Sequence, residues 1–253
     1  MSIFGSKVAL VTGAGTGIGR AVALDFAEKG AAVAVADINA KEAEQTVELI
    51  KKAGGQALFV QANVSKAEEC QSMVEKTVAA FGRLDYACNN AGIGGASATV
   101  ADMKTEDWRR VIDVNLNGVF FSMKYEIPAI LKAGGGAIVN MASILGQVGF
   151  ANAAAYVAAK HGVLGLTKSA ALEYAAQGVR VNAICPAFVA TPMLEQAGIT
   201  SNEAMLKTIE GLHPIGRLGT PEEIAKVVTF LCSPDASFMH GEAVLVDGAY
   251  VAR

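Results

Sequence analysis

Hydrophobic and polar positions along the chain follow two alternating patterns. Seven short runs are almost continuously apolar, at residues 7–12, 32–36, 57–61, 84–88, 137–141, 180–185 and 243–246. The longer stretches between them place apolar residues at helical spacing. Strands that alternate with helices are typical of a parallel sheet with crossover helices. Because the runs have no polar face, we expect helices to cover both faces of the sheet.

The stretches with helical period are residues 17–29, 41–53, 67–81, 105–131, 154–177 and 221–233. Ser65 and Thr220 stand at the expected starts of two of these helices, and glutamates follow each of them at first-turn positions. Such residues commonly cap a helix N-terminus. Gly30, Gly54 and Gly178 stand where three helices should end, as C-capping glycines do.

The alternation runs along the whole chain. No Pro- or Ser-rich linker, repeat or low-complexity segment interrupts it, so we predict one domain over residues 1–253. The segment 191–219 fits the alternation poorly and follows the sixth predicted strand. We interpret this segment as an insertion that forms a substrate loop.

The apolar content raises the question of a membrane. Of the 253 residues, 52% are hydrophobic and 18% are charged, and the mean hydropathy is +0.37. This composition excludes a disordered chain. The stretch 133–159 has no charged residue and exceeds the roughly 20 residues that a spanning helix needs. It contains glycines and polar side chains throughout, so we reject a membrane span. The start of the chain shows no export signal, and we expect a cytoplasmic protein.

The charged and metal-binding residue types point to no polyanionic partner and no metal. The formal net charge is −3, from 21 basic and 24 acidic residues, and no basic stripe is present that could bind a nucleic acid. The three histidines form no pair at metal-ligand spacing. The cysteines lie far apart, and we expect buried free thiols at Cys70, Cys88, Cys185 and Cys232.

A glycine-rich turn follows the first predicted strand. Residues 12–19 read Thr-Gly-Ala-Gly-Thr-Gly-Ile-Gly, and the next helix begins inside this sequence. A turn of this kind binds a pyrophosphate, because backbone N–H groups and the positive end of the helix face the anion. The spacing of Gly13, Gly17 and Gly19 departs from the standard GxGxxG fingerprint. A tight turn without a ligand therefore stays open as the alternative.

An acidic residue ends the second predicted strand. Asp37 lies 18 residues beyond Gly19, close to the spacing of the carboxylate that accepts hydrogen bonds from an adenosine ribose. Its negative charge disfavours the 2′-phosphate of NADP, and neither Thr16 nor Ile38 supplies a compensating cation. We therefore expect NAD(H) rather than NADP as cofactor. The alternative role of Asp37 is that of an ordinary turn residue.

Residues with chemical functions follow the fifth predicted strand. Tyr156 and Lys160 stand four positions apart in a helical stretch, which places the phenol and the ammonium on one face. Ser143 precedes Tyr156 by 13 residues and lies just past the strand, at the edge where open parallel sheets bind ligands. Each residue alone has an ordinary interpretation, in packing or in a turn. Their combination with the glycine-rich turn predicts an active site.

These motifs make the sequence resemble the short-chain dehydrogenase/reductase family over nearly the whole chain. The matching positions are residues 12–19, the Asn-Asn-Ala-Gly sequence at residues 89–92, Asn115, Ser143, Tyr156, Lys160 and Thr191. The resemblance implies an α/β fold, a single-domain Rossmann-type doubly wound parallel sheet with helices on both faces. It also implies an oxidoreductase with a nicotinamide cofactor. The ordered set of motifs is specific for the family and much less specific for the substrate.

The resemblance assigns catalytic roles to four residues. Tyr156 should be the general acid in ketone reduction and the base in alcohol oxidation, but a free tyrosine is only about 0.1% ionised at pH 7. Half ionisation needs about 4 kcal/mol of stabilisation, which the Lys160 ammonium and the positive nicotinamide can supply. Ser143 should donate a hydrogen bond to the substrate oxygen. Asn115 should anchor a water that leads protons to Lys160.

The resemblance also implies the cofactor-binding residues Gly13, Thr16, Gly17, Ile18, Gly19, Asp37, Ile38, Asn63, Val64, Asn90, Ala91, Gly92, Tyr156, Lys160, Pro186, Val189 and Thr191. Asn89 is expected to be a structural side chain instead. Two positions depart from the common family pattern, because Asn63 replaces an aspartate and Ala187 replaces a glycine. The Asn63 carbonyl can still accept a hydrogen bond from the adenine amino group. The Ala187 methyl is expected to narrow the site beside the nicotinamide.

The region around the predicted chemistry is apolar and has few fixed charges. It supplies the candidate substrate-binding residues Ser143, Leu145, Phe150 and Tyr156. An apolar lining favours a hydrophobic secondary alcohol or ketone over a sugar acid or a phosphorylated substrate. Glu195 and His213 are the polar exceptions in the adjoining segment. Solvent-facing loop positions are the simpler interpretation of these two residues.

The leading hypothesis is an NAD-dependent alcohol dehydrogenase or ketone reductase. One alternative is a 3-oxoacyl-carrier-protein reductase, which would prefer NADPH and show a basic docking patch. The other is a non-catalytic nucleotide-sensing protein of the same fold, which the complete set of four catalytic residues argues against. Family members are mostly tetramers, so we expect a homotetramer in which the apolar segment 241–251 takes part in a subunit contact.

Overall fold

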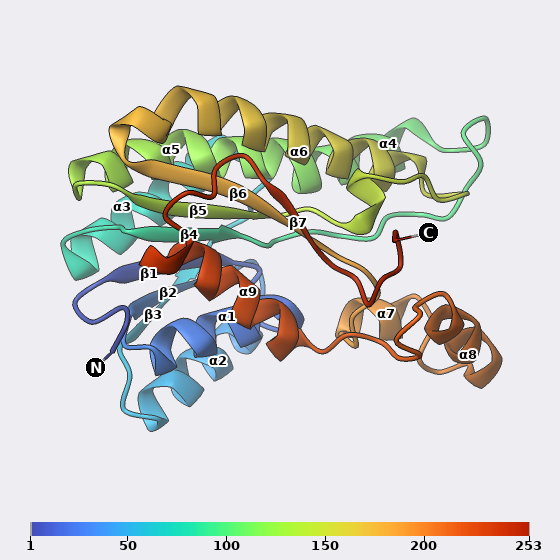
Figure 1. Cartoon of the computed structure of the whole chain (residues 1–253), viewed down its shortest axis with the longest axis horizontal. Helices are drawn as coiled ribbons and strands as arrows, with labels where there is room; N and C mark the ends of the chain where they lie inside the picture. Colours follow the sequence, from blue (N-terminus) through green and yellow to red (C-terminus); the bar gives the residue numbers. More distant parts are fainter. Residues whose placement is uncertain (1, 253) are drawn as a thin grey trace.

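The computed structural model of the protein describes residues 2–252 and contains a seven-stranded sheet whose strands are all parallel (Figure 1). The strand order is β3-β2-β1-β4-β5-β6-β7. The bounds are β1 Val8–Thr12, β2 Ala32–Asp37, β3 Ala57–Gln61, β4 Tyr86–Asn89, β5 Gly136–Met141, β6 Val179–Pro186 and β7 Ala243–Val246. The order reverses between β1 and β4, the switch point at which open α/β sheets bind ligands. The predicted Rossmann-type parallel sheet is confirmed.

Helices pack on both faces of the sheet, as Figure 1 shows. One face carries α1 (Gly17–Glu28), α2 (Ala40–Lys52) and α9 (Pro221–Cys232). The opposite face carries α3 (Ala67–Phe81), α5 (Gly118–Lys132) and α6 (Ala154–Tyr174). The crossover helices that the sequence pattern predicted therefore enclose the sheet from both sides.

Each face of the sheet has its own hydrophobic core. Along β1, Ala9 and Val11 belong to the core below α1 and α9, and Val8 and Leu10 belong to the core below α3, α5 and α6. All four side chains are at most 3% exposed. Neither face of the strand meets water, which explains why the strand carries no polar face in the sequence.

The stretch 105–131, predicted as one helix, contains a change of helix type. α4 (Thr105–Ile112) is followed by a π-helical turn at Asp113–Asn117 and then by α5. π-helical turns inside α-helices frequently mark functional sites. Asn115 lies in this turn and is fully buried. The helix therefore continues through residues 105–132, but its backbone hydrogen-bond pattern changes at Asn115, a predicted catalytic residue.

Of the two predicted helix caps, one is confirmed and the other is wrong. The Thr220 side chain accepts a hydrogen bond from the Glu223 N–H, and the Glu223 carboxylate accepts one from the Thr220 N–H, so α9 begins with a capping box. Ser65 does not cap α3, because Lys66 occupies the N-cap position. The Ser65 hydroxyl instead donates to Asn63 Oδ1 at 2.8 Å.

The charge-free stretch 133–159 does not form one helix. It forms β5, a short 3-10 turn at Ile144–Gly146 and the first turns of α6. Within residues 2–252, no helix is long and apolar enough to cross a membrane. The four cysteines are free and buried, as the sequence predicted.

The segment 191–219 contains two short helices, α7 (Pro192–Gln196) and α8 (Glu203–Gly211), which lie beyond the end of the sheet in Figure 1. Hydrogen bonds of 3.0 Å join the two ends of this segment. The Ala190 N–H donates to the Gly219 carbonyl, and the Gly219 N–H donates to the Phe188 carbonyl. α7 and α8 therefore sit on the chain that leaves β6, next to the predicted site.

Candidate active site

The glycine-rich turn between β1 and α1 requires glycine for steric reasons. Gly13 and Gly17 have φ angles of 62° and 51°, which favour glycine. A Cβ atom on Gly19 would lie 2.1 Å from the Gly13 carbonyl oxygen. Thr16 provides no side-chain cap for α1, and the first turn of α1 holds no acidic residue. The glycines let the turn pack closely against the start of α1, and the N–H groups at this start have no side-chain cap. Such a helix start fits the pyrophosphate of a dinucleotide.

Asn90 fixes the glycine-rich turn to the end of β4. Its Nδ2 donates to the Thr12 carbonyl at 2.9 Å and to the Gly13 carbonyl at 3.1 Å. In return, Thr12 Oγ1 accepts hydrogen bonds from the N–H groups of Asn90 at 3.0 Å and Ala91 at 3.1 Å. The segment 90–92, predicted to lie below the adenosine ribose, is thereby held against the turn on the neighbouring strand.

Asp37 ends β2 at the same edge of the sheet. Its Oδ2 accepts a hydrogen bond from the Gly15 N–H at 2.8 Å, and its Oδ1 accepts one from the Asn39 N–H at 2.9 Å. These two bonds fix the carboxylate beside the glycine-rich turn. Ile38 is 61% exposed and carries no charge to this position.

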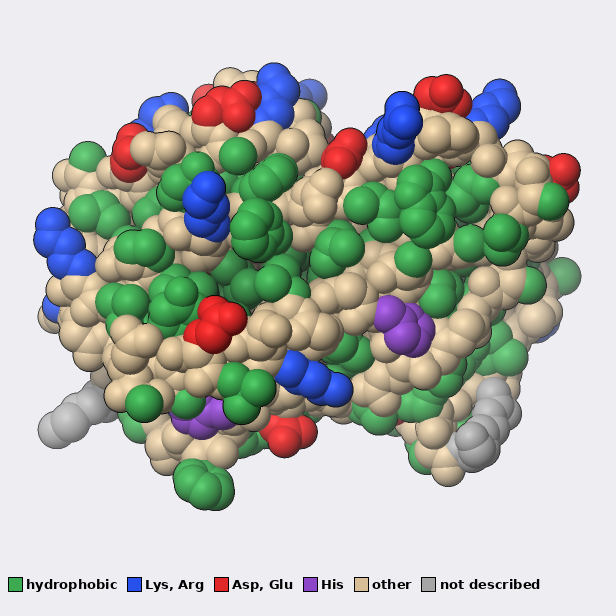
Figure 2. Space-filling model, turned by 90° about the horizontal axis from the view of Figure 1, so that it is seen from above, with side chains coloured by type: hydrophobic (Ala, Val, Ile, Leu, Met, Phe, Trp, Pro, Cys, Tyr) green, Lys and Arg blue, Asp and Glu red, His purple; other side chains and the backbone are tan. Residues whose placement is uncertain are grey.

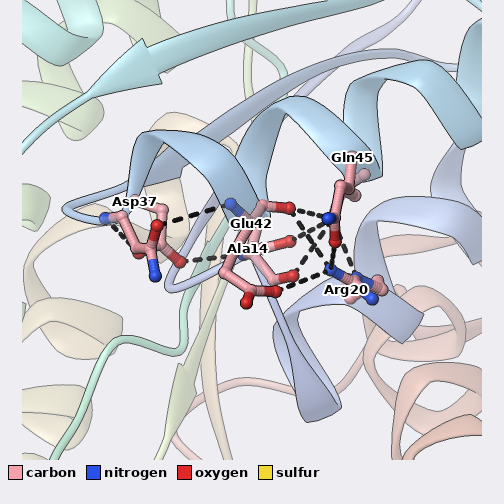
Figure 3. Close-up of polar contacts among 8 residues, drawn as sticks. Ala14, Arg20, Asp37, Glu42 and Gln45 are labelled. Atoms are coloured by element: carbon pink, nitrogen blue, oxygen red, sulfur yellow. Dashed lines mark hydrogen bonds and ion pairs between the residues drawn. The ribbon is translucent and has the colours of Figure 1, made fainter.

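Sequence reasoning missed Arg20, a cation close to the turn. Its guanidinium donates to Thr46 Oγ1 at 3.0 Å and to Glu42 Oε2 at 3.2 Å, so α2 holds it (Figure 3). A Cβ atom on Gly15 would lie 2.9 Å from Asp37 Oδ2 and also 2.9 Å from Glu42 Cβ. Two acidic residues therefore flank the turn, and the cation near them is already paired. The available signal was an arginine directly after the last glycine of the turn.

Asn63, predicted to contact adenine, follows β3. Its Oδ1 accepts hydrogen bonds from the Ser65 N–H at 3.1 Å and the Ser65 hydroxyl at 2.8 Å. These bonds use both lone pairs of the carbonyl oxygen, so a bond to adenine would have to replace one of them. Val64 is buried beside it. The contact between Asn63 and adenine stays a prediction.

Three of the four residues predicted for the chemistry, Ser143, Tyr156 and Lys160, lie together at the carboxyl end of β5. Tyr156 and Lys160 are one turn apart on α6, and Lys160 Nζ lies 5.4 Å from the centre of the Tyr156 ring. Lys160 is buried and its Nζ donates to the Met141 carbonyl at 2.7 Å. Ser143 is also buried, and its Oγ accepts a hydrogen bond from the Leu145 N–H at 3.2 Å.

Burial shifts the pKa values of both titratable groups of this set. Desolvation raises the pKa of Tyr156, and the Ser143 side chain opposes that shift in part. Desolvation lowers the pKa of Lys160 to about 8. The lysine is therefore still mostly protonated at pH 7. Because the pKa of Tyr156 starts above the ordinary value, half ionisation at pH 7 needs more than the about 4 kcal/mol that a free tyrosine requires.

Asn115 is held by the chain that follows segment 90–92. Its Nδ2 donates to the Ile93 carbonyl, and its Oδ1 accepts from the Ile93 N–H, both at 2.8 Å. A Cβ atom on Gly92 would lie 3.2 Å from Asn115 Oδ1. The π-helical turn thus fixes the backbone that leaves β4, and each of the two groups of the Asn115 side chain makes one hydrogen bond to Ile93.

The chain that leaves β6 reaches back to the start of α1. Pro186 ends β6, and Thr191 Oγ1 donates to the Val189 carbonyl at 3.2 Å. A Cβ atom on Gly17 would lie 3.3 Å from Thr191 Cγ2. The structure therefore brings together two parts of the predicted cofactor site that lie far apart in the sequence.

Four rings form an aromatic cluster between the end of β6, the segment 191–219 and the C-terminal segment. Phe188 packs edge-on against Phe150 at 6.2 Å and His213 at 5.8 Å between ring centres, and Tyr250 lies 5.4 Å from His213. His213 is 3% exposed, so its interpretation as a solvent-facing residue was wrong. Sequence reasoning missed Tyr250, because nothing in its local pattern links it to Phe188.

The His213 ring connects α8 to the chain after β6. Its Nδ1 lies 2.9 Å from the Ile209 carbonyl, and its Nε2 lies 3.4 Å from the Phe188 N–H. Leu145 is buried, Phe150 is 42% exposed and Glu195 is exposed as expected. The substrate contacts of Leu145 and Phe150 stay predictions. Among residues 2–252, no group of three or more His, Cys, Asp or Glu side chains could hold a metal ion.

Comparison with known proteins agrees with this arrangement. The model of a family described as Enoyl-(Acyl carrier protein) reductase matches residues 13–250, from the glycine-rich turn to the C-terminal segment. The chain belongs to the short-chain dehydrogenase/reductase family. The glycine-rich turn, the π-helical turn and the Tyr156–Lys160 pair are thus parts of a short-chain dehydrogenase/reductase fold, and the protein is an oxidoreductase of this family.

Three relatives match this short-chain dehydrogenase/reductase over nearly their whole length. The cyclohexanol dehydrogenase of Acinetobacter sp. strain SE19 is 52% identical over 250 residues, which cover 99% of this chain and 97% of the relative. The cis-4-hydroxycyclohexanecarboxylate dehydrogenase of Sinomonas cyclohexanicum is 43% identical, with 98% of each chain covered. A 3-oxoacyl-[acyl-carrier-protein] reductase of Staphylococcus aureus is also 43% identical, over 96% of this chain and 97% of its own.

A solved structure of the same family shows a bound cofactor. It is the crystal structure of an Agrobacterium tumefaciens protein with bound NADP, which matches this chain with a TM-score of 0.90. The two sequences are 37% identical, and the match covers 98% of each chain.

Proposed function

We propose that this protein transfers a hydride between NAD(H) and a hydrophobic secondary alcohol or ketone, with Tyr156 as general acid and base. The observation that carries the proposal is the position of Tyr156, Lys160 and Ser143 at the sheet edge, beside a glycine-rich turn that Thr191 contacts. A dinucleotide and a small alcohol can lie side by side at this edge. A non-catalytic nucleotide-sensing protein would have no need for a buried lysine next to a tyrosine.

The residues at the sheet edge fit a nicotinamide dinucleotide. When bound, its nicotinamide ring accepts or gives the hydride. The uncapped start of α1 would hold the pyrophosphate, and the carboxylate of Asp37 would accept hydrogen bonds from the adenosine ribose. The Val189 backbone and Thr191 would hold the carboxamide. We favour NAD over NADP, because Asp37 and Glu42 both flank the turn and the cation of Arg20 is paired with Glu42.

Tyr156 carries the proton of the reaction. In alcohol oxidation the phenolate accepts the hydroxyl proton, and in ketone reduction the phenol donates it. The Lys160 ammonium favours the phenolate, because an opposite charge close by stabilises the charged form. Ser143 Oγ accepts from the Leu145 N–H, and the Ser143 side chain also hydrogen-bonds Tyr156. The Ser143 hydroxyl would donate to the substrate oxygen as negative charge develops there.

Asn115 contributes through its position in the π-helical turn. Its two bonds to Ile93 use one N–H and one lone pair of the amide, so the side chain can still bind a water through its second N–H or second lone pair. Backbone carbonyls in a π-helical turn lie outside the regular i to i+4 pattern. The water that connects solvent to Lys160 would bind at this turn, either to the Asn115 amide or to a backbone carbonyl of the turn.

A cyclic secondary alcohol is the substrate class that we propose. Two relatives over the full length are dehydrogenases of cyclohexanol and of a hydroxycyclohexanecarboxylate. In the aromatic cluster, the rings of Phe150, Phe188 and Tyr250 around the buried His213 offer surface against which a saturated ring can pack. An acyl-carrier-protein substrate is the second candidate, which the Staphylococcus aureus relative and the description of the matching family support.

A substrate panel with each cofactor tests this proposal. The panel contains cyclohexanol, an open-chain secondary alcohol and a 3-oxoacyl thioester, each with NAD(H) and NADP(H), and nicotinamide absorbance reports turnover. We expect the highest kcat/KM with cyclohexanol and NAD. Turnover of the thioester with NADPH in preference to the alcohols would contradict the cyclic-alcohol proposal and support the acyl-carrier alternative.

A further inference from the structure

A buried carboxyl group lies away from the chemistry described above. Glu126 is in the middle of α5 and is fully buried. The Asn89 amide at the end of β4 donates to Glu126 Oε2 at 3.0 Å, and also to Asn140 Oδ1 on β5 at 3.0 Å. Asn89 was expected to be structural, and the structure shows it as the centre of a polar cluster inside the hydrophobic core.

The Asn89 amide is the first donor of this cluster, and it donates toward both Glu126 and Asn140. The Thr167 hydroxyl donates to the Val163 carbonyl at 2.8 Å, and the Asn140 amide donates to Thr167 Oγ1 at 3.0 Å. Two buried oxygens then remain without any hydrogen-bond partner, Asn89 Oδ1 and Glu126 Oε1. Both belong to residues that already share one hydrogen bond.

An ionised Glu126 does not fit this environment. A buried carboxylate is costly unless it is paired with a cation or receives several hydrogen bonds. Among residues 2–252, no cation forms a hydrogen bond or ion pair with Glu126, and its single donor is the Asn89 amide. Turning the Asn89 amide over would bring Asn89 Oδ1 against Glu126 Oε2, and two oxygens in contact also require a proton between them.

We propose that Glu126 is a neutral carboxylic acid whose proton, on Oε1, is donated to Asn89 Oδ1, and that this acid–amide pair positions the end of β4. One proton satisfies both unpartnered oxygens. A carboxylic acid and a primary amide each carry one donor next to one acceptor, so the two groups match as a cyclic pair. The role of the pair in cofactor binding, but not the protonation of Glu126, rests on the proposed function.

The pair connects α5 to the cofactor side of the sheet. Asn89 directly precedes Asn90, which holds the Thr12 and Gly13 carbonyls of the glycine-rich turn. In the proposed pair, loss of the proton leaves two acceptor oxygens facing each other with no donor between them, and they repel each other. We therefore expect ionisation of Glu126 to displace Asn89 and to weaken NAD binding through Asn90. Glu126 is a positioning residue in this account.

The electrostatics of the neighbouring groups agree with a neutral acid. Burial raises the pKa of Glu126 to about 8, and the Asn89 hydrogen bond opposes this in part. The titratable side chains that interact with it are Cys70 on α3 and Cys88 on β4. Burial raises the pKa of Cys70 to about 11 and that of Cys88 well above its usual value, so both thiols stay neutral.

The sign of the pH dependence follows from this shift. A carboxyl group has a pKa near 4.5 in the unfolded chain and a raised pKa in the folded protein. Its contribution to stability is complete below the unfolded pKa and is lost as the pH rises through about 8. An ordinary ionised carboxylate with a bound water would give no loss of stability in this range.

The substitution Glu126→Gln tests the protonation state, because glutamine reproduces the donor and the acceptor of the neutral acid without a titration. Urea unfolding is measured for both proteins between about pH 5 and pH 8. We expect the unfolding equilibrium constant of the wild type to rise relative to Glu126→Gln by about tenfold per pH unit. The exposed Glu173→Gln on α6 is the matched control and should give a constant ratio to the wild type.

Two results would overturn the protonation of Glu126. One is a ratio between the wild type and Glu126→Gln that does not change with pH. The other is failure of Glu126→Gln to fold, since a neutral isostere must be accepted at a neutral site. The infrared band of a protonated carboxylic acid gives an independent readout. It should be present in the folded wild type at neutral pH and reduced in Glu126→Gln.

The positioning role has its own readout. The dissociation constant of NADH, measured by its fluorescence, should rise about fivefold in the wild type as the pH passes through the titration of Glu126. It should show no such rise in Glu126→Gln. Equal pH dependence in both proteins would contradict the positioning role. If NADH does not bind at all, the proposed function fails, and the unfolding and infrared measurements still decide the state of Glu126.

Discussion

At the scale of single residues, Asp37 carries the discrimination between the two nicotinamide cofactors. Hydrogen bonds from the Gly15 and Asn39 N–H groups fix its carboxylate beside the glycine-rich turn. We predict that Asp37→Ala combined with Ile38→Arg raises the ratio of kcat/KM for NADP over NAD by about tenfold or more, because a repulsive charge is removed and a cation is added. Steady-state kinetics with both cofactors measures the ratio.

A matched control separates charge from side-chain size in this experiment. The combination of Asp37→Ala with Ile38→Gln removes the repulsion but adds no cation, so its ratio should lie between those of the wild type and the arginine variant. An unchanged ratio in the arginine variant would show that Asp37 does not set the preference.

Residue types at fixed spacing predicted which side chains lie together at the sheet edge. Ser143, Tyr156 and Lys160 come together because a helix places positions four apart on one face and a strand ends just before the serine. The spacing did not show which polar atoms already form hydrogen bonds within the protein. The Asn115 amide is bonded to Ile93, and Asn63 Oδ1 is bonded to Ser65. These contacts depend on local backbone geometry that spacing does not reveal.

At the scale of elements, the start of α9 provides a measurable contribution to stability. Thr220 and Glu223 form the capping box, and Arg217 adds an ion pair of 2.7 Å to Glu223. We predict that Thr220→Ala lowers the free energy of unfolding by about 1 kcal/mol, because the Glu223 N–H at the helix start loses its side-chain cap. Urea unfolding at neutral pH measures the change.

Ser65, which was predicted to cap α3 but does not, provides the control for this prediction. Ser65 lies outside the N-cap position of α3, so Ser65→Ala should change the free energy of unfolding by less than about 0.5 kcal/mol. Equal losses for the two substitutions would contradict the assignment of the caps.

The elements differ in how well the sequence predicted them. The strands were visible because both of their faces are buried, which leaves continuous apolar runs such as β1. The π-helical turn at Asp113–Asn117 was not visible, because α4 and α5 continue on either side of it and the apolar spacing runs through. The cap of α3 was placed one residue too early, since Ser65 and Lys66 are both polar and local sequence does not separate them.

At the scale of the whole molecule, apolar side chains are exposed on the layer of α4, α5 and α6. Trp108 is 40% exposed, Phe120 is 47% exposed and Leu172 is 87% exposed. Figure 2 views the molecule from this side and shows hydrophobic side chains across its middle, with most charges toward the edge. Exposed apolar side chains of this kind are typical of surfaces that contact another protein.

We predict that the protein is a homotetramer, as the resemblance to the family implied, with this layer in one of the subunit contacts. Light scattering should give four times the mass of the 26.0 kDa chain. The double substitution Trp108→Glu and Phe120→Glu should lower that mass, because charges would be buried without partners. A wild-type mass equal to a single chain would contradict the prediction.

Whole-molecule packing also explains what the sequence could not show. From the sequence, the high apolar content was assigned mainly to a buried sheet. The structure places apolar side chains in two hydrophobic cores and also on the exposed layer of α4, α5 and α6. His213 and Tyr250 meet Phe188 from segments that are distant in the sequence. Glu126 meets Asn89 across 37 positions. Pairs of this kind follow from the arrangement of the whole chain, and no local pattern reveals them.

The turnover of Tyr156→Phe with cyclohexanol and NAD, under conditions in which chemistry limits the rate, tests the proposed function most directly. The substitution removes the hydroxyl that carries the proton and keeps the ring, and Tyr174→Phe at the far end of α6 is the control. We expect kcat to fall by about 10²–10⁴-fold, with little change in the dissociation constant of NADH and normal turnover in the control. Turnover of Tyr156→Phe close to that of the wild type would contradict the proposed mechanism.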